Sequence, residues 1–185
     1  FTFDPGFMAT AACESRITYI DGDNGILLYR GYPIEQLATK SSFLETAYLL
    51  LHGDLPVSSQ FEQFDRSIRY HTMLNESLLR FFNGFHYNAH PMAMVSAVVS
   101  SMAAFYHDSM DNNNPRHREI FAHRILAKIP TVSAAAFKHM LGQPFVYPRN
   151  DLDYCANMLN MFFAVPAEDY VVDPMAAEAL DLLLM

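Results

Sequence analysis

Signals that start and stop helices recur along almost the whole chain, and they constrain the fold more than any other feature of the sequence. Ser42 can cap a run of helix-favouring residues from Phe43 to Leu51, and Gly53 can end it. The same kinds of signal stand at Pro33, Ser58, Gly84, Asn114, Pro130, Gly142, Asn150 and Asp173. Between them, apolar residues repeat at spacings of three and four, as on the buried face of a helix. We therefore expect a multi-helical, mainly α fold with about eight or nine helices.

The helices of the second half can be given limits from these signals. Asn114 and Pro115 open a helix that runs to Lys128, and Pro130 opens another that Gly142 closes, because proline favours the first turn of a helix. Asn150 and Asp151 cap a helix that reaches Phe163. Asp173 followed by Pro174 starts the last helix. The pattern thus predicts four helices after Asn114.

A β-hairpin is expected near the start of the chain. Residues 17–20 and 26–29 favour β-structure, and the Gly and Asn residues of the segment 21–25 supply the positive φ values that a hairpin loop needs. No internal repeat, low-complexity tract or long linker follows. We therefore divide the chain into a β element at residues 1–32 and a partial large helical domain at residues 33–185.

Charge and hydropathy exclude two classes of partner. The 185 residues hold 12 Lys and Arg against 20 Asp and Glu, a formal charge of -8 that repels nucleic acid and anionic membrane surfaces. The most apolar run, residues 91–106, is shorter than the roughly 20 residues that span a bilayer, so we interpret it as a buried core helix. The cysteines Cys13 and Cys155 lie far apart and form no paired motif, which favours a reducing, cytoplasmic setting.

The candidate metal and catalytic motifs are weak. His86 and His90 have helical spacing, but Gly84 and Pro91 bracket them and indicate an irregular turn. His117 and His123 lie among charged residues and have the pattern of a solvated helix face, so no metal site is predicted. The chain contains no G-x-S-x-G elbow and neither of the glycine-rich phosphate loops.

Several segments, in order along the chain, resemble citrate synthase of the hexameric Gram-negative bacterial type. These segments are residues 1–7, 20–23, 30–38, 71–73, 90–93, 104–109, 113–120 and 142–154, the last reading Gly-Gln-Pro-Phe-Val-Tyr-Pro-Arg-Asn-Asp-Leu-Asp-Tyr. They cover essentially the whole chain, and the resemblance implies the N-terminal part of that family's large helical domain. Phe1 is not a methionine, and residues 182–185 lack a capping residue, so we expect a truncated chain.

The resemblance implies an acyltransferase that condenses acetyl-CoA with oxaloacetate and water to give citrate and CoA in the tricarboxylic acid cycle. The family's catalytic Asp and His residues lie in motifs of the types HADHEQN and GPAHGG, and neither string occurs here. We therefore expect no catalytic residue and no cofactor in this chain, which would be inactive alone. The intact parent would be a homo-oligomer, either a dimer or a hexamer. Two alternatives stay open: a non-catalytic helical regulatory or assembly module, and a related condensing enzyme such as a methylcitrate synthase.

The resemblance also implies an allosteric NADH site. The matching positions are His71, Met73, Tyr106, Arg124, Lys128 and Asn150. Arg124 and Lys128 are four residues apart on a predicted helix, so both cations could face one phosphate-bearing ligand, although an ordinary basic helix face has the same spacing.

Other positions depart from the pattern of NADH-sensitive members. Tyr70 replaces an Arg, Ala167 replaces a Cys, and residues 85–88 read Phe-His-Tyr-Asn in place of Phe-Arg-Arg-Asp. Basic positions thereby lose permanent charge. The sequence therefore predicts weak inhibition of the parent by NADH, or none.

Overall fold

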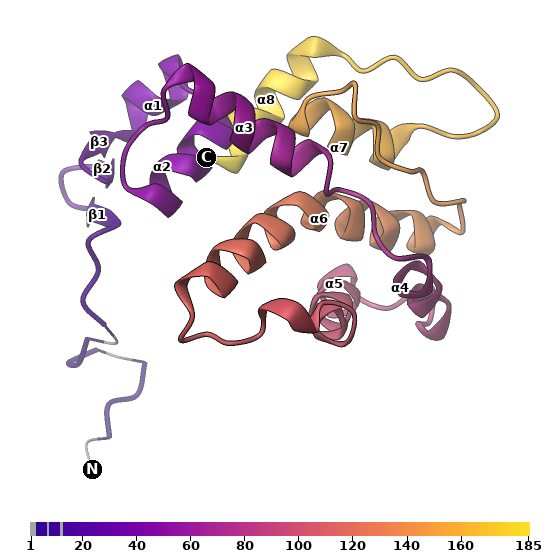
Figure 1. Cartoon of the computed structure of the whole chain (residues 1–185), viewed down its shortest axis with the longest axis horizontal. Coiled ribbons are helices and arrows are strands. Elements are labelled where there is room, and N and C mark those ends of the chain that lie inside the picture. Colours follow the sequence, from indigo (N-terminus) through magenta and orange to yellow (C-terminus); the bar gives the residue numbers. More distant parts are fainter. Residues whose placement is uncertain (1–2, 7, 12) are drawn as a thin grey trace. The chain divides into compact units, whose positions relative to one another are not determined.

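The computed structural model describes residues 3–6, 8–11 and 13–185 (Figure 1). Phe1, Thr2 and Phe7, which belong to the first of the resembling segments, lie outside the described residues, as does Ala12. The chain divides into two compact units. The first comprises residues up to Phe61 together with Met185, and the second runs from Glu62 to Leu184.

The first unit contains a small antiparallel sheet and two helices. Its elements are β1 (Thr18–Asp21), β2 (Ile26–Tyr29), β3 (Tyr32–Pro33), α1 (Ile34–Lys40) and α2 (Phe43–His52). The strands have the order β1-β2-β3, and Tyr19 pairs with Leu28 in the predicted hairpin. The hairpin is therefore confirmed, and β3 adds a third strand that the sequence did not indicate.

Helix α2 begins and ends as its sequence predicts. The Ser42 hydroxyl accepts a hydrogen bond from the Glu45 backbone N–H at 3.3 Å, and the Glu45 carboxylate accepts one from the Ser42 N–H at 2.8 Å. This reciprocal pair satisfies two of the N–H groups that a helix N-terminus leaves without partners. At the other end Gly53 has a φ of 98°, a conformation that a side chain would disfavour.

The second unit is almost entirely helical. Helix α3 (Ser58–Arg69) crosses the boundary between the units, and the following elements are α4 (Glu76–Arg80), the 3₁₀ turns η1 (Phe81–Gly84), η2 (Met102–Ala104) and η3 (His107–Ser109), and the helices α5 (Pro91–Ser101), α6 (Pro115–Leu141), α7 (Tyr154–Phe163) and α8 (Pro174–Leu184). Helix α6 packs against α5 and α7, and α7 packs against α8 (Figure 1). The predicted mainly α fold is thus confirmed.

The main core lies where α4, η1 and α5 meet α6. Leu78, Phe82, Met94 and Val98 are fully buried there, and the Phe82 ring also contacts Phe145 with the ring centres 5.7 Å apart. Only one face of α5 takes part, because Met92 on the same helix is 63% exposed. The interpretation of residues 91–106 as a buried core helix is therefore confirmed only for one face: α5 supplies Met94 and Val98 to the core, exposes its other face and ends at Ser101.

The predicted helix boundary at Pro130 is wrong. Helix α6 is 27 residues long and continues without a break through this buried proline. A proline inside a helix has no N–H to donate to the carbonyl four residues earlier, here that of Leu126. The hydroxyl of Tyr154 on α7 donates to this carbonyl instead, at 2.9 Å. The packing of α7 on α6 thus replaces the hydrogen bond that Pro130 removes, and the helix is not interrupted.

The last two helices have caps of the predicted residue type. Helix α7 starts at Tyr154, where Asp153 accepts a hydrogen bond from the Ala156 N–H at 2.7 Å, so the cap is Asp153 and not Asn150 or Asp151. The Asp173 cap of α8 is confirmed, since its carboxylate accepts from the Met175 N–H at 2.9 Å. Within the described residues, no helix combines the length and apolar character needed to cross a membrane.

Candidate anion-binding site

Two cations on α6 face one aromatic ring in the second unit. Arg124 and Lys128 lie one turn apart on the helix, and Tyr106 lies in the loop between η2 and η3. The Arg124 guanidinium carbon is 4.3 Å from the centre of the Tyr106 ring, and the Lys128 Nζ is 5.4 Å from it. Both distances allow attraction between a cation and the face of the ring. The cations are therefore held next to each other despite their like charge.

Lys128 is buried and fixed by two backbone carbonyls. Its Nζ donates to the carbonyl oxygens of His71, at 2.6 Å, and of Met73. Burial, and secondly the charge of Arg124, lower the pKa of Lys128 to about 8. Among the described residues these two carbonyls are its hydrogen-bond acceptors, which leaves one of the three ammonium N–H groups for a ligand.

Arg124 is anchored on the other side by the η3 turn. Its Nη1 donates to the Ser109 hydroxyl at 2.7 Å and to the Asp108 carboxylate at 3.2 Å. The Arg124 side chain is 16% exposed, whereas that of Asp108 is 69% exposed. Hydrogen bonding to Arg124 is the main cause that lowers the pKa of Asp108. The guanidinium is thus nearly buried, and an exposed carboxylate lies at its outer edge.

A cavity of about 260 Å³ opens beside the two cations. The residues that line it come from α3, from the loop after α3, from the loop between η2 and η3 and from α6: Ser67, His71, Tyr106, Ile120, His123, Arg124 and Lys128. His71 donates from Nδ1 to the Ser67 carbonyl at 2.6 Å, since a carbonyl can only accept, and this fixes the ring at the cavity wall. The described residues that line this cavity include two cations and no carboxylate, so the cavity favours an anion.

The structure brings most of the sequence-predicted site residues together. Tyr106, Arg124, Lys128 and His71 line the cavity, and Met73 takes part through its carbonyl oxygen. Asn150 is exposed in the turn before α7 and is not among the described residues that line the cavity.

Other residues of the cavity wall, among them His123 and Ile120, were not predicted from the sequence. His123, assigned to a solvated helix face, is partly buried against Phe64 with the ring centres 5.0 Å apart, and it lines the cavity. Ile120 precedes Arg124 by one turn, so helical spacing alone could have placed it on this face. His86 and His90 lie outside the helices as expected, and His90 caps α5.

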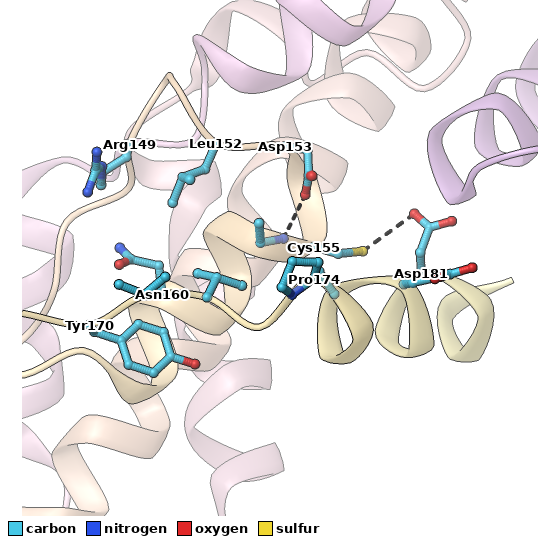
Figure 2. A pocket seen from close by; sticks show the side chains of 13 residues that line it. Arg149, Leu152, Asp153, Cys155, Asn160, Tyr170, Pro174 and Asp181 are labelled. Carbon is cyan, nitrogen blue, oxygen red and sulfur yellow. Dashed lines mark hydrogen bonds between the residues drawn. The ribbon is translucent and has the colours of Figure 1, made fainter.

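A larger cavity, of about 610 Å³, lies between α7, α8 and the loops before them (Figure 2). Its walls carry the carboxylates of Asp153, Glu178 and Asp181, and its cation Arg149 is paired with Asp151 at 2.6 Å. Figure 2 shows the Cys155 thiol directed at Asp181, to which it donates a hydrogen bond at 3.5 Å. Burial and the neighbouring carboxylate raise the pKa of this thiol, which keeps it protonated. The larger cavity therefore repels anions, and its cysteine is not a nucleophile.

Comparison with known proteins assigns a family to this arrangement. The family model described as "Citrate synthase, C-terminal domain" matches residues 6–185, which is nearly the entire chain. The chain belongs to the citrate synthase family. Among solved structures, citrate synthase from Pyrobaculum aerophilum is similar with a TM-score of 0.84 and 30% identity, over 96% of this chain and 45% of that one.

Two further citrate synthase structures have a similar fold. The enzyme from Thermotoga maritima MSB8 has a TM-score of 0.77 and 28% identity, over 98% of this chain and 45% of that one. The citrate synthase of Thermoplasma acidophilum, in a ternary complex with carboxymethyl coenzyme A and oxaloacetate, shares the fold with a TM-score of 0.82 and 21% identity, over 94% of this chain and 44% of that one. The chain spans less than half the length of each of these three proteins.

Proposed function

We propose that this chain forms the helical scaffold portion of a citrate synthase that condenses acetyl-CoA with oxaloacetate. Nearly complete coverage by the family model supports the assignment. The reaction requires a positioned base to remove a poorly acidic C–H proton, and donors that hold the developing oxygen charge. The family motifs to which the sequence resemblance assigns these groups do not occur among the 185 residues. The chain therefore contributes framework and binding surface, while the chemistry belongs to other segments of the intact enzyme.

A test of this division of roles is an assay of CoA release from acetyl-CoA and oxaloacetate. The isolated 185-residue chain should show no turnover above a heat-treated control, because a missing catalytic group removes the chemistry itself. The intact enzyme that carries this segment should release CoA in step with citrate formation. Turnover by the isolated chain would show that the catalytic groups lie within it.

The cavity between α3 and α6 is proposed to bind NADH as an allosteric effector, as in the hexameric Gram-negative type of the family. The observation that carries this proposal is the joint placement of Tyr106, Arg124 and Lys128 around one cavity. A dinucleotide combines phosphate groups, which suit the two cations, with flat heterocycles, which suit the tyrosine ring.

The intact enzyme is also proposed to act in the cytoplasm as a homo-oligomer.

The size of the cavity limits how much of the dinucleotide it can hold. Sites that enclose a whole drug-sized ligand have volumes of roughly 300–1,000 Å³, and this one has about 260 Å³. It therefore fits the pyrophosphate and one adjoining group, while the rest of the ligand lies outside. Affinity should accordingly be modest.

The test is inhibition of the intact enzyme by NADH, with variants that separate Arg124 from the general charge of α6. Arg124→Lys keeps the charge but loses the forked geometry, and it should weaken inhibition by about tenfold, the equivalent of one charge-assisted phosphate contact. Arg116 lies on the same helix and is exposed, so Arg116→Lys is the matched control and should leave inhibition unchanged. Equal effects of the two substitutions, or no inhibition by NADH at any concentration, would contradict the proposed site.

A further inference from the structure

The phosphate-binding edge of Arg124 is already occupied in this structure. Asp108 approaches the guanidinium with both carboxylate oxygens, one at 3.2 Å from Nη1 and the other at 3.5 Å from Nη2. This parallel arrangement of two nitrogens and two oxygens is the one in which arginine binds a phosphate group. An anion and the Asp108 carboxylate therefore require the same pair of donors.

The surroundings of the pair determine which partner can move. The Arg124 side chain is fixed by its stacking on Tyr106 and by its hydrogen bond to the buried Ser109. Asp108 lies in the short η3 turn, and its side chain is 69% exposed. The carboxylate can thus rotate into solvent without disturbing the core, whereas the guanidinium cannot leave its place.

We propose that Asp108 is an internal competitor for the anionic ligand: its carboxylate holds the Arg124 fork in the free protein and swings away when a phosphate group binds. This inference rests on the proposed anion site and adds a regulatory contact to it. The Asp108 carboxylate thereby excludes small anions that can make only one weak contact with the site. A dinucleotide displaces it because Lys128 and the Tyr106 ring add further attraction.

The expected effect follows from the exposure of the pair. Because the Asp108 side chain is largely exposed, solvent screens the pair, which then changes an equilibrium constant by about fivefold at most. Asp108→Asn keeps the shape of the side chain and removes both the competing charge and its repulsion of the ligand. The affinity for a phosphate-bearing ligand should therefore rise about two- to fivefold, and Asp108→Glu, which restores a carboxylate, should stay within about twofold of the unsubstituted protein.

Asp111 provides a matched control three residues away. It is exposed, lies in the same loop region, and uses its carboxylate to accept a hydrogen bond from the Asn113 N–H at 2.9 Å, which an asparagine can also do. Asp111→Asn therefore removes one negative charge from the same loop region without changing the partners of Arg124. The experiment titrates the intact protein and its three variants with NADH and, separately, with inorganic pyrophosphate, at low ionic strength and with folding verified by circular dichroism.

Tighter binding of both probes by Asp108→Asn, and not by Asp111→Asn, is the expected result. Equal effects of the two substitutions, or no effect of Asp108→Asn, would contradict the role of Asp108 as a competitor but not the proposed anion site. If only pyrophosphate binds and Asp108→Asn strengthens its binding, the role of Asp108 as a competitor is supported and the assignment of NADH as the ligand is wrong. If neither probe binds to any variant, both proposals fail.

Discussion

We expect Lys128 to make ligand binding at the proposed site depend on pH between 7 and 9. Burial of the ammonium, and secondly the charge of Arg124, lower the pKa of Lys128 to about 8. An anionic ligand needs the protonated form, since the neutral amine offers no charge. Raising the pH through 8 removes the proton and should therefore weaken binding.

The size of the effect follows from proton linkage. If only the protonated protein binds, the apparent dissociation constant is multiplied by a factor of one plus the ratio of neutral to charged lysine. For a pKa of about 8 this factor is about 1.1 at pH 7 and about 11 at pH 9, a roughly tenfold loss of affinity. A lysine with the ordinary pKa near 10.4 would lose less than about 1.1-fold over the same range.

NADH titrations of the intact enzyme at half-unit steps between pH 7 and 9 measure this loss. Most of the titration of an ordinary imidazole lies below pH 7, so this range emphasises the titration of the lysine. Lys128→Met should bind more weakly at pH 7 and show a flat profile, because it has no titrating amine. An unchanged affinity across the range, or a tenfold loss that persists in Lys128→Met, would refute the assignment of the titrating group.

Three further predictions concern stability and effector response. In urea unfolding, Tyr154→Phe should lower the free energy of unfolding by about 1–3 kcal/mol, because the Leu126 carbonyl loses its donor. Tyr147→Phe is the control: it removes an exposed hydroxyl and should lower the free energy of unfolding by under about 0.5 kcal/mol. Phe82→Ala should cost about 3–5 kcal/mol in the same assay, since the ring is fully buried; a cost under 1 kcal/mol would place it outside the core. Tyr70→Arg should strengthen inhibition by NADH about tenfold at low salt by adding a charge-assisted phosphate contact, and an unchanged inhibition constant would show that Tyr70 is not the missing determinant.

The parts of the fold that depend on local signals could be predicted from the sequence. The capping box of Ser42, the turn at Gly53 and the Asp173 cap each involve residues within a few positions of one another. The helix through Pro130 could not be predicted, because the hydroxyl that satisfies the Leu126 carbonyl comes from a residue 28 positions away. Local chemistry alone would stop a helix at that proline.

The candidate site shows the same limit. The spacing of Arg124 and Lys128 predicted that the two cations share a helix face, but spacing could not show that the Lys128 ammonium reaches a carbonyl 57 positions earlier in the chain. The resemblance to citrate synthase supplied Tyr106 and His71. Asp108 was missed because its contact with Arg124 depends on how the η3 turn lies against α6.

A crystal structure of the intact enzyme grown with NADH would show where the dinucleotide binds. We expect a phosphate group of the dinucleotide within hydrogen-bond distance of Arg124 and Lys128, one ring against Tyr106, and Asp108 turned into solvent. NADH bound instead in the acidic cavity beside Asp181, or bound elsewhere with the Arg124 and Asp108 pair intact, would contradict it.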